Sequence, residues 1–144
     1  MPAHEQNRHL LHHWREAVPD DRLAHLIRDV ARAQMRALQQ RLSAHDVSFG
    51  HWTFLRILWI KDGQTQRELS ELAGVMEPTT FAAVKAMEAM GLIERRQLPG
   101  NRKNIHIFLT PAGRRLEKLL VPLAEEVNRV SVAGIPEKSI ATVR

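Results

Sequence analysis

The stretch TQRELSELAGVMEPTTFAAVKAMEAMGLIERRQLPGNRKNIHIFL, residues 65–109, predicts two helices joined by a tight turn and followed by a β-hairpin. Thr65 and Glu68 have the spacing of a capping box, in which each side chain accepts a hydrogen bond from a free amide at the helix start. Gly74 ends this short helix, because glycine adopts a left-handed backbone conformation at little cost. We expect the helix to bury three apolar side chains, Leu69, Leu72 and Ala73.

A second helix is predicted between Pro78 and Gly91. Proline suits the first helical turn, where its missing N–H would have no partner within the helix. One face has the i, i+3, i+4, i+7 spacing of a buried stripe, and it consists of Thr80, Ala83, Val84 and Met87. The two helices form a predicted helix-turn-helix, whose second helix presents its outer face to the DNA major groove. The residues predicted to contact DNA there are Glu77, Pro78, Thr79, Phe81, Ala82 and Lys85.

The hairpin predicted after Gly91 forms a basic wing. We expect Arg95 and Arg96 to end its first strand and Leu98-Pro99-Gly100 to make the turn, with Ile105, Ile107 and Leu109 facing inward on the second strand. Cations concentrated on one short hairpin favour binding to phosphates, and an arginine at the tip can enter a minor groove. The phosphate contacts are predicted at Arg95, Arg96 and Lys103, and the groove contact at Arg102.

Both features also have a plainer interpretation. The outer face of the second helix could be solvated only, and charged hairpin tips usually are. Phe81 argues against this for the helix, since an exposed phenylalanine ring can contact a thymine methyl group. A basic wing next to a helix-turn-helix further favours nucleic-acid binding over a merely solvated surface.

Residues 85–116, with MEAMGLIERR, the basic wing and LTPAGRRLE, resemble the winged helix of the MarR family of bacterial transcription regulators. GHWTFLRIL upstream is similar to the family's second helix, and the resemblance extends over residues 23–130. It implies sequence-specific binding to duplex DNA by a homodimer, mainly as a repressor, on an inverted-repeat operator. The family's wing tip usually reads Asp-Arg-Arg, whereas this chain has Asn101-Arg102-Lys103. Arg102 keeps the groove-entering position, but the carboxylate that commonly braces this arginine is missing.

The expected fold is mainly α with a small β-hairpin wing: a winged helix-turn-helix attached to a helical dimerisation layer. We expect an N-terminal arm at residues 1–19, a dimerisation helix within 20–47, the winged helix-turn-helix at 48–110 and C-terminal dimerisation helices at 111–144. The last helix is expected to be truncated at Arg144, because family members usually continue it. The competing class of function is a winged helix used for protein–protein assembly without operator recognition.

The helices outside the winged region are predicted from apolar stripes. Asp20 and Asp21 would cap a long helix, and Ser48 would cap a helix that is apolar on nearly every side and therefore buried. Thr110 and Pro111 would start a later helix, which we expect to kink or break at Pro122. The stripe of the first helix is Leu23, Leu26, Ile27, Val30, Gln34, Ala37, Leu38 and Leu42, and that of the later helix is Leu116, Leu119, Leu120, Leu123, Val127 and Val130.

Composition narrows the classes of function. The net charge of +5 favours a polyanionic partner. The chain has no cysteine, which excludes disulfides and thiolate catalysis. It has no nucleophile–base–acid set and no glycine-rich phosphate loop, so an enzyme is not expected and no cofactor is predicted. Without an apolar run long enough for a membrane span or a signal peptide, we expect a cytoplasmic protein and no membrane partner.

Two further groups of residues suggest small ligands. His4, His9, His12 and His13 could hold zinc, but a solvated arm is the more common outcome, and no metal site is predicted. The resemblance implies an effector, often an aromatic acid, bound between the dimerisation layer and the winged helix. Indole faces can hold a flat ring while a cation pairs with its carboxylate, although tryptophans can equally be plain core and arginines plain surface. The candidate residues are Trp14, Arg15, His51, Trp52 and Arg56.

Overall fold

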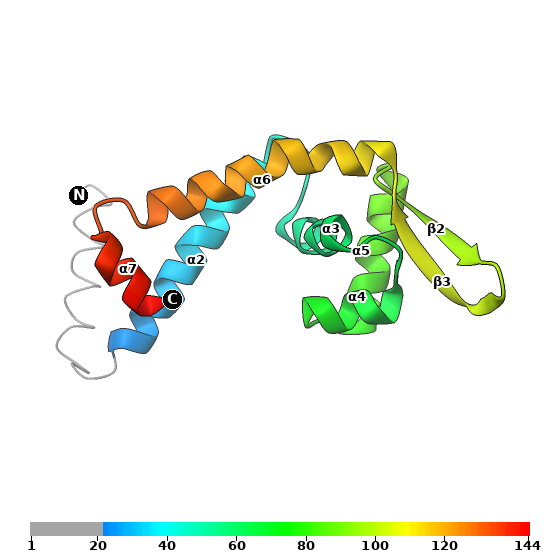
Figure 1. Ribbon diagram of the computed structural model, residues 1–144, viewed down its shortest axis with the longest axis horizontal. Coiled ribbons are helices and arrows are strands. Elements are labelled where there is room, and N and C mark those ends of the chain that lie inside the picture. The colour runs from blue at the N-terminus through cyan, green and yellow to red at the C-terminus, as the bar shows by residue number, and fades with distance from the viewer. Residues whose placement is uncertain (1–21) are drawn as a thin grey trace, which may run out of the picture. The chain divides into compact units, whose positions relative to one another are not determined.

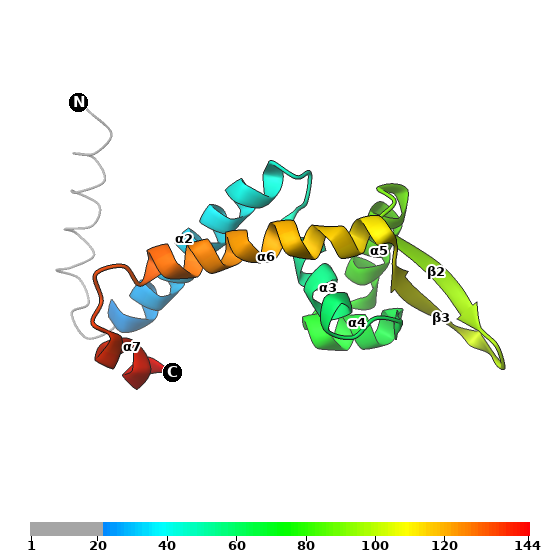
Figure 2. The same cartoon turned by 45° about the horizontal axis from the view of Figure 1, so that its top comes forward.

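The computed structural model describes residues 22–144 (Figures 1 and 2). The chain divides into two compact units, one ending at Arg36 and the other running from Ala37 to Arg144. Helix α2 (Arg22–Ser43) begins in the first unit and ends in the second. The buried core lies in the second unit. The predicted histidine-rich arm and the caps at Asp20 and Asp21 lie outside the described residues.

Helix α3 (Phe49–Ile60) runs through the core of the second unit. It begins at Ser48 as predicted, where the Ser48 hydroxyl accepts a hydrogen bond from the His51 amide at 3.1 Å. The prediction that the helix is buried holds for four of its side chains but not for Ile60, which is 85% exposed. Ile60 is the last residue of the helix, where the chain turns away from the core. The buried side chains are Trp52, Phe54, Leu55 and Leu58.

The helix-turn-helix consists of α4 (Gln66–Ala73) and α5 (Glu77–Ala89). The predicted capping box is present: the Thr65 hydroxyl accepts from the Glu68 amide at 3.2 Å, and the Glu68 carboxylate accepts from the Thr65 amide at 2.8 Å. The prediction that α4 buries Leu72 is wrong, since that side chain is 62% exposed. Ser70 lies inside instead, and a 2.7 Å hydrogen bond joins its hydroxyl to that of Thr80 on α5.

The sheet has three antiparallel strands in the order β1-β3-β2, namely β1 (Gln64–Thr65), β2 (Ile93–Leu98) and β3 (Asn101–Leu109). The short strand β1, which joins α3 to α4, was not predicted. The first hairpin strand does not end at Arg95 and Arg96 but continues to Leu98, because the turn needs only Pro99 and Gly100. Gly100 has a φ of 80°, as a type II turn with proline before glycine requires.

Only the inner half of the hairpin belongs to the core. Ile107 and Leu109 are buried as predicted, at 1% and 5% exposed. Ile105 was expected to face inward with them but is 44% exposed. It lies nearer the tip, beyond the reach of β1, whose pairing with β3 ends at Ile107 and His106.

Helix α6 (Pro111–Ser131) follows the hairpin, and α7 (Glu137–Val143) ends the chain. Thr110 caps α6 as predicted, accepting from the Gly113 amide at 3.1 Å. The helix is not broken at Pro122. This side chain is exposed, so water can solvate the backbone carbonyl that loses its N–H partner there. Within the predicted stripe, Leu120 and Val127 are buried, whereas Leu119 and Val130 are 53% and 60% exposed on the single chain.

Gly113, in the first turn of α6, provides a stability test. A Cβ added there would lie 2.1 Å from the Leu92 carbonyl oxygen, which is backbone and cannot easily move. We expect Gly113→Ala to lower the free energy of unfolding by about 1–3 kcal/mol, as overpacking typically does. Urea denaturation measures this.

Gly50 in α3 is the matched control, because a Cβ there would meet only the Ser48 hydroxyl at 3.8 Å. Gly50→Ala should raise stability by roughly 0.5–1 kcal/mol, since alanine loses less backbone entropy than glycine in a helix. Equal midpoints for the two variants would contradict the close packing of α6 on the start of β2.

Candidate nucleic-acid interface

Helix α5 has one buried and one open face. Thr80, Val84 and Met87 are at most 1% exposed, which confirms the predicted inner stripe. The hydroxyl of Thr80 is satisfied by Ser70 of α4, so the two helices are held together by a polar contact within an apolar core. The six α5 residues predicted to contact DNA are all exposed, and their role stays a prediction: Glu77, Pro78, Thr79, Phe81, Ala82 and Lys85.

The strand pairing is irregular near the tip of the hairpin, and two basic residues lie in the irregular segment. Gln97 pairs with Ile105, but the next β2 residue, Leu98, pairs with Asn101. The three intervening residues of β3 therefore have no Cα partner on β2 and form a bulge. Arg102, Lys103 and Asn104 make up this bulge, and all three are exposed. Bulges re-aim side chains away from a regular ladder, so the tip presents two cations outside the pairing pattern.

Arg95 and Arg96, predicted as equivalent phosphate ligands, lie on opposite faces of β2, because successive strand side chains alternate. Arg95 forms an ion pair with Glu88 at the end of α5, with a nitrogen–oxygen distance of 2.8 Å. Arg96 pairs with Glu94 at 2.9 Å, and its guanidinium lies 4.1 Å from the centre of the Phe108 ring. Each arginine already has an acidic partner.

Three cations of this region differ from that pair. Within the described part of the chain, no ion pair involves Lys85, Arg102 or Lys103. All three are exposed. An unpaired surface cation can bind an anion without first losing an internal partner. On α5 and the wing, the cations without an ion pair therefore lie on the outer face of α5 and on the wing bulge.

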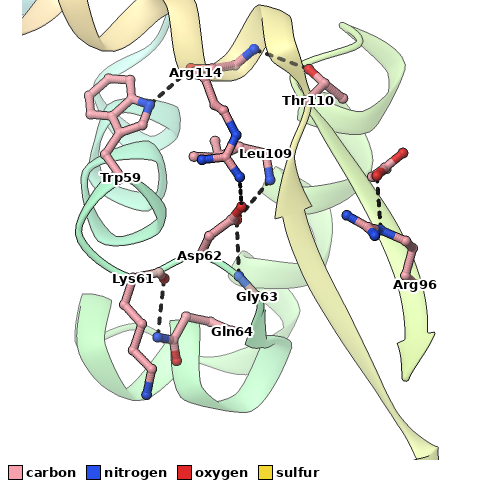
Figure 3. A network of polar contacts seen from close by, with 11 residues as sticks. Trp59, Lys61, Asp62, Gly63, Gln64, Arg96, Leu109, Thr110 and Arg114 are labelled. Carbon is pink, nitrogen blue, oxygen red and sulfur yellow. Dashed lines mark hydrogen bonds and ion pairs between the residues drawn. The ribbon is translucent and has the colours of Figure 1, made fainter. Parts of the chain in front are cut away.

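The base of the wing is fixed by one carboxylate, that of Asp62 (Figure 3). Its Oδ1 accepts hydrogen bonds from the Gly63 amide at 3.0 Å and from the Leu109 amide at 2.9 Å. Its Oδ2 accepts from the guanidinium of Arg114. Asp62 thus joins the turn after α3, the end of β3 and the start of α6.

Further hydrogen bonds to backbone carbonyls, from Thr110 and His106, reinforce this junction. The Thr110 hydroxyl donates to the Gly91 carbonyl at 2.6 Å, and the Thr110 amide donates to the Leu92 carbonyl at 3.0 Å. On the other side of β3, the His106 imidazole Nδ1 lies 2.8 Å from the Gly63 carbonyl oxygen. The two strands of the wing are therefore tied to the end of α5 and to the turn before α4.

A second candidate site lies on α3. Trp52 is 4% exposed, and the Arg56 guanidinium lies 5.6 Å from its ring centre. Trp59, which sequence analysis did not single out, contacts Trp52 edge to face at 5.6 Å between ring centres and donates to the Gly113 carbonyl at 3.0 Å. The structure thus brings together Trp52 and Arg56, two of the five residues predicted for effector binding. Trp14 and Arg15 lie outside the described residues.

His51 has a different character from the one predicted. Its Nδ1 is buried and has no hydrogen-bond partner within residues 22–144. Burial lowers the pKa of His51 below its ordinary value of 6.5, because desolvation disfavours the imidazolium. His51 is therefore less readily protonated than an ordinary histidine, which makes it a weaker candidate than Arg56 for pairing with a carboxylate. Arg56 remains the cationic candidate.

Glu88 and Asp62 are the residues that sequence reasoning missed. Glu88 and Arg95 lie on either side of the turn between α5 and β2, and this spacing was the available signal for their ion pair. The two side chains meet only when the hairpin folds back on α5.

Within the described residues, no group of three His, Asp or Glu side chains could hold a metal ion, and no helix is long and apolar enough to cross a membrane.

Residues 47–105 match the family model of the MarR family. The transcriptional regulator TtmR of Methylorubrum extorquens is 26% identical over 119 residues, which are 83% of this chain and 61% of TtmR. The chain thus spans less than two thirds of that relative.

Solved structures share the fold. A MarR family regulator from Listeria monocytogenes, complexed with 26mer DNA, is 26% identical with a TM-score of 0.75, over 83% of this chain and 80% of that chain. BpsR of Bordetella bronchiseptica, regulated by 6-hydroxynicotinic acid, is 19% identical with a TM-score of 0.75, over 85% of this chain and 93% of that chain. The winged helix of this chain is thus matched by the model of the MarR family, and its fold is similar to that of these regulators.

Proposed function

We propose that this protein is a transcriptional repressor that binds a specific duplex DNA sequence as a homodimer. One observation carries the proposal: the open face of α5 stands beside a hairpin whose bulge holds the unpaired cations Arg102 and Lys103. Helix α5 would enter the major groove and read bases. The bulge would reach the flanking backbone or minor groove, where negative potential is concentrated. The Listeria regulator complexed with DNA supports this assignment.

The ion pairs divide the wing arginines by role. Arg102 and Lys103 would contact DNA directly. Arg95, held by Glu88, would mainly fix the hairpin against α5. Arg96, held by Glu94 and Phe108, would contribute less to phosphate binding than an unpaired arginine.

Homodimerisation is proposed from apolar surface that the single chain leaves open. On α6 and the loop after it, Leu119, Val130 and Ile135 are 53%, 60% and 48% exposed. On α2, four residues of the predicted stripe are more than half exposed. Monomers rarely expose contiguous apolar surface of this kind. The four α2 residues are Leu23, Leu26, Ile27 and Val30.

Selection from random duplex DNA tests the proposal against a protein–protein assembly module. A repressor of this kind enriches an inverted repeat with half-sites about 10 base pairs apart, one helical turn, and sediments as a dimer at micromolar concentration. Placed downstream of a promoter, the selected site should reduce transcription when the protein is added. Absence of any enriched sequence would favour the assembly module.

The wing tip gives a residue-level prediction. Arg102→Ala should weaken binding to the selected operator by about 1–3 kcal/mol and reduce the salt dependence by about one released counterion. Arg129, an exposed arginine in the last turn of α6, is the control, and Arg129→Ala should leave both quantities unchanged. Titrations at several salt concentrations measure this, and identical slopes for wild type and Arg102→Ala would remove Arg102 from the interface.

We further propose that an aromatic carboxylate regulates the protein through α3. The edge-to-face pair of Trp52 and Trp59 offers an apolar wall, and Arg56 supplies the cation for the carboxylate. BpsR is regulated by 6-hydroxynicotinic acid, an acid of this type. Such a ligand releases DNA only if it binds the DNA-incompetent conformation more tightly than the competent one.

A panel of benzoates, cinnamates and nicotinates tests this. We expect at least one to raise the melting temperature and weaken operator binding, and Arg56→Ala to reduce both effects without changing DNA affinity in the absence of ligand. His51→Ala should have a smaller effect, since burial lowers the pKa of the imidazole and so disfavours its charged form. A panel that leaves melting and DNA affinity unchanged would exclude an aromatic-acid effector.

A further inference from the structure

Three of the six exposed α5 side chains predicted to contact DNA have no hydrogen-bonding group. Pro78, Phe81 and Ala82 are all exposed, and Phe81 is 49% exposed although it is large and apolar. These three residues are called here the α5 apolar patch. Phe81 and Ala82 lie three and four residues after Pro78, so both are its neighbours on the helix surface.

Polar side chains border the patch, among them the exposed Thr79, which follows Pro78 directly. Glu77 precedes Phe81 by four residues, and Lys85 follows it by four, so one carboxylate and one ammonium flank the phenyl ring. The buried face opposite is fixed by Thr80, Val84 and Met87, which prevents α5 from rotating to offer other side chains. Base pairs that lie against the three patch residues therefore contact carbon, and donors or acceptors come only from the polar side chains that border the patch.

The charge around the α5 apolar patch indicates what kind of partner binds it. Lys85 adjoins it, the wing bulge adds Arg102 and Lys103, and none of these cations has an ion pair within the described residues. An apolar surface bordered by unpaired positive charge complements a groove lined by phosphates better than it complements an ordinary protein surface. The one apolar group on a base edge in the major groove is the C5 methyl group of thymine.

We propose that the α5 apolar patch reads thymine methyl groups, with Phe81 as the main specificity-determining residue. This inference deepens the proposed function and rests on it. Recognition is by burial of the methyl group against the phenyl ring, so a thymine is preferred because cytosine and the purines lack that group at this position. Each methyl buried in this way should contribute roughly fourfold in affinity.

Uracil substitution isolates the methyl group. Uracil keeps the hydrogen-bonding edge of thymine and lacks only the C5 methyl. Each thymine of the operator selected by the wild-type protein is replaced singly by deoxyuridine, and dissociation constants are measured for wild type, Phe81→Ala and Met90→Ala. Met90 is 39% exposed at the opposite end of α5, so its variant controls for loss of exposed apolar surface on the same helix.

We expect wild type and Met90→Ala to lose roughly fourfold in affinity at one or more thymines of each half-site. Phe81→Ala should bind the unmodified operator more weakly and show no further loss on uracil substitution at that position. Because Phe81 is not part of the core, this variant should keep the wild-type circular dichroism and melting temperature.

The inference is overturned if every uracil substitution is neutral for wild type, or if Phe81→Ala retains the full uracil effect. In both cases an enriched operator still supports the proposed function, with sequence read by other means. If selection enriches no sequence, the proposed function fails, and this inference fails with it.

Discussion

The carboxylate of Asp62 is the contact on which the arrangement of the winged helix depends. Two regions far apart in the sequence meet at this point, and three groups donate to the same side chain: one in the turn after α3, one at the end of β3 and one in the first turns of α6. Without it, the Leu109 amide at the end of β3 would lose its acceptor. A hydrogen bond to a charged acceptor is among the stronger kinds, and Asp62 makes three.

Around this junction, charges are used in two ways. Near the base of the wing, cations are paired: Arg114 with Asp62, Arg95 with Glu88 and Arg96 with Glu94. At the tip, Arg102 and Lys103 have no ion pair within residues 22–144 and lie in a bulge outside the strand pairing. The paired charges orient the hairpin against α5, and the unpaired ones remain for a polyanion. The bulge has a further consequence: without it, regular pairing of β3 with β2 would have placed these cations within the ladder.

Local patterns were enough to predict most of the fold. The capping box at Thr65, the left-handed glycine at Gly74 and the inner stripe of α5 depend on neighbours within one or two helical turns, and all three were confirmed. The errors involve tertiary context. Leu72 has the spacing of a core residue but lies outside, and Ser70 lies inside because Thr80 of the next helix offers it a partner. The extent of β2 and the unpredicted strand β1 depend on β3, which no local pattern contains.

The candidate site shows the same division. Exposure of the α5 face follows from periodicity, and the basic character of the wing follows from composition. The pairing of Arg95 with Glu88, the stacking of Arg96 on Phe108 and the contact between Trp52 and Trp59 require the chain to have folded back on itself. The burial that lowers the pKa of His51 likewise depends on the folded chain rather than on residue type.

The most direct test of this account is amide hydrogen exchange across β2 and β3 in Asp62→Ala. If Asp62 fixes the wing to the helical core, the Leu109 amide and its neighbours in β3 should exchange much faster than in the wild-type protein, while the buried amides of α5 keep their protection. Unchanged protection throughout the hairpin would show that the ladder and the Thr110 contacts alone hold the wing, and would contradict the central role given to Asp62.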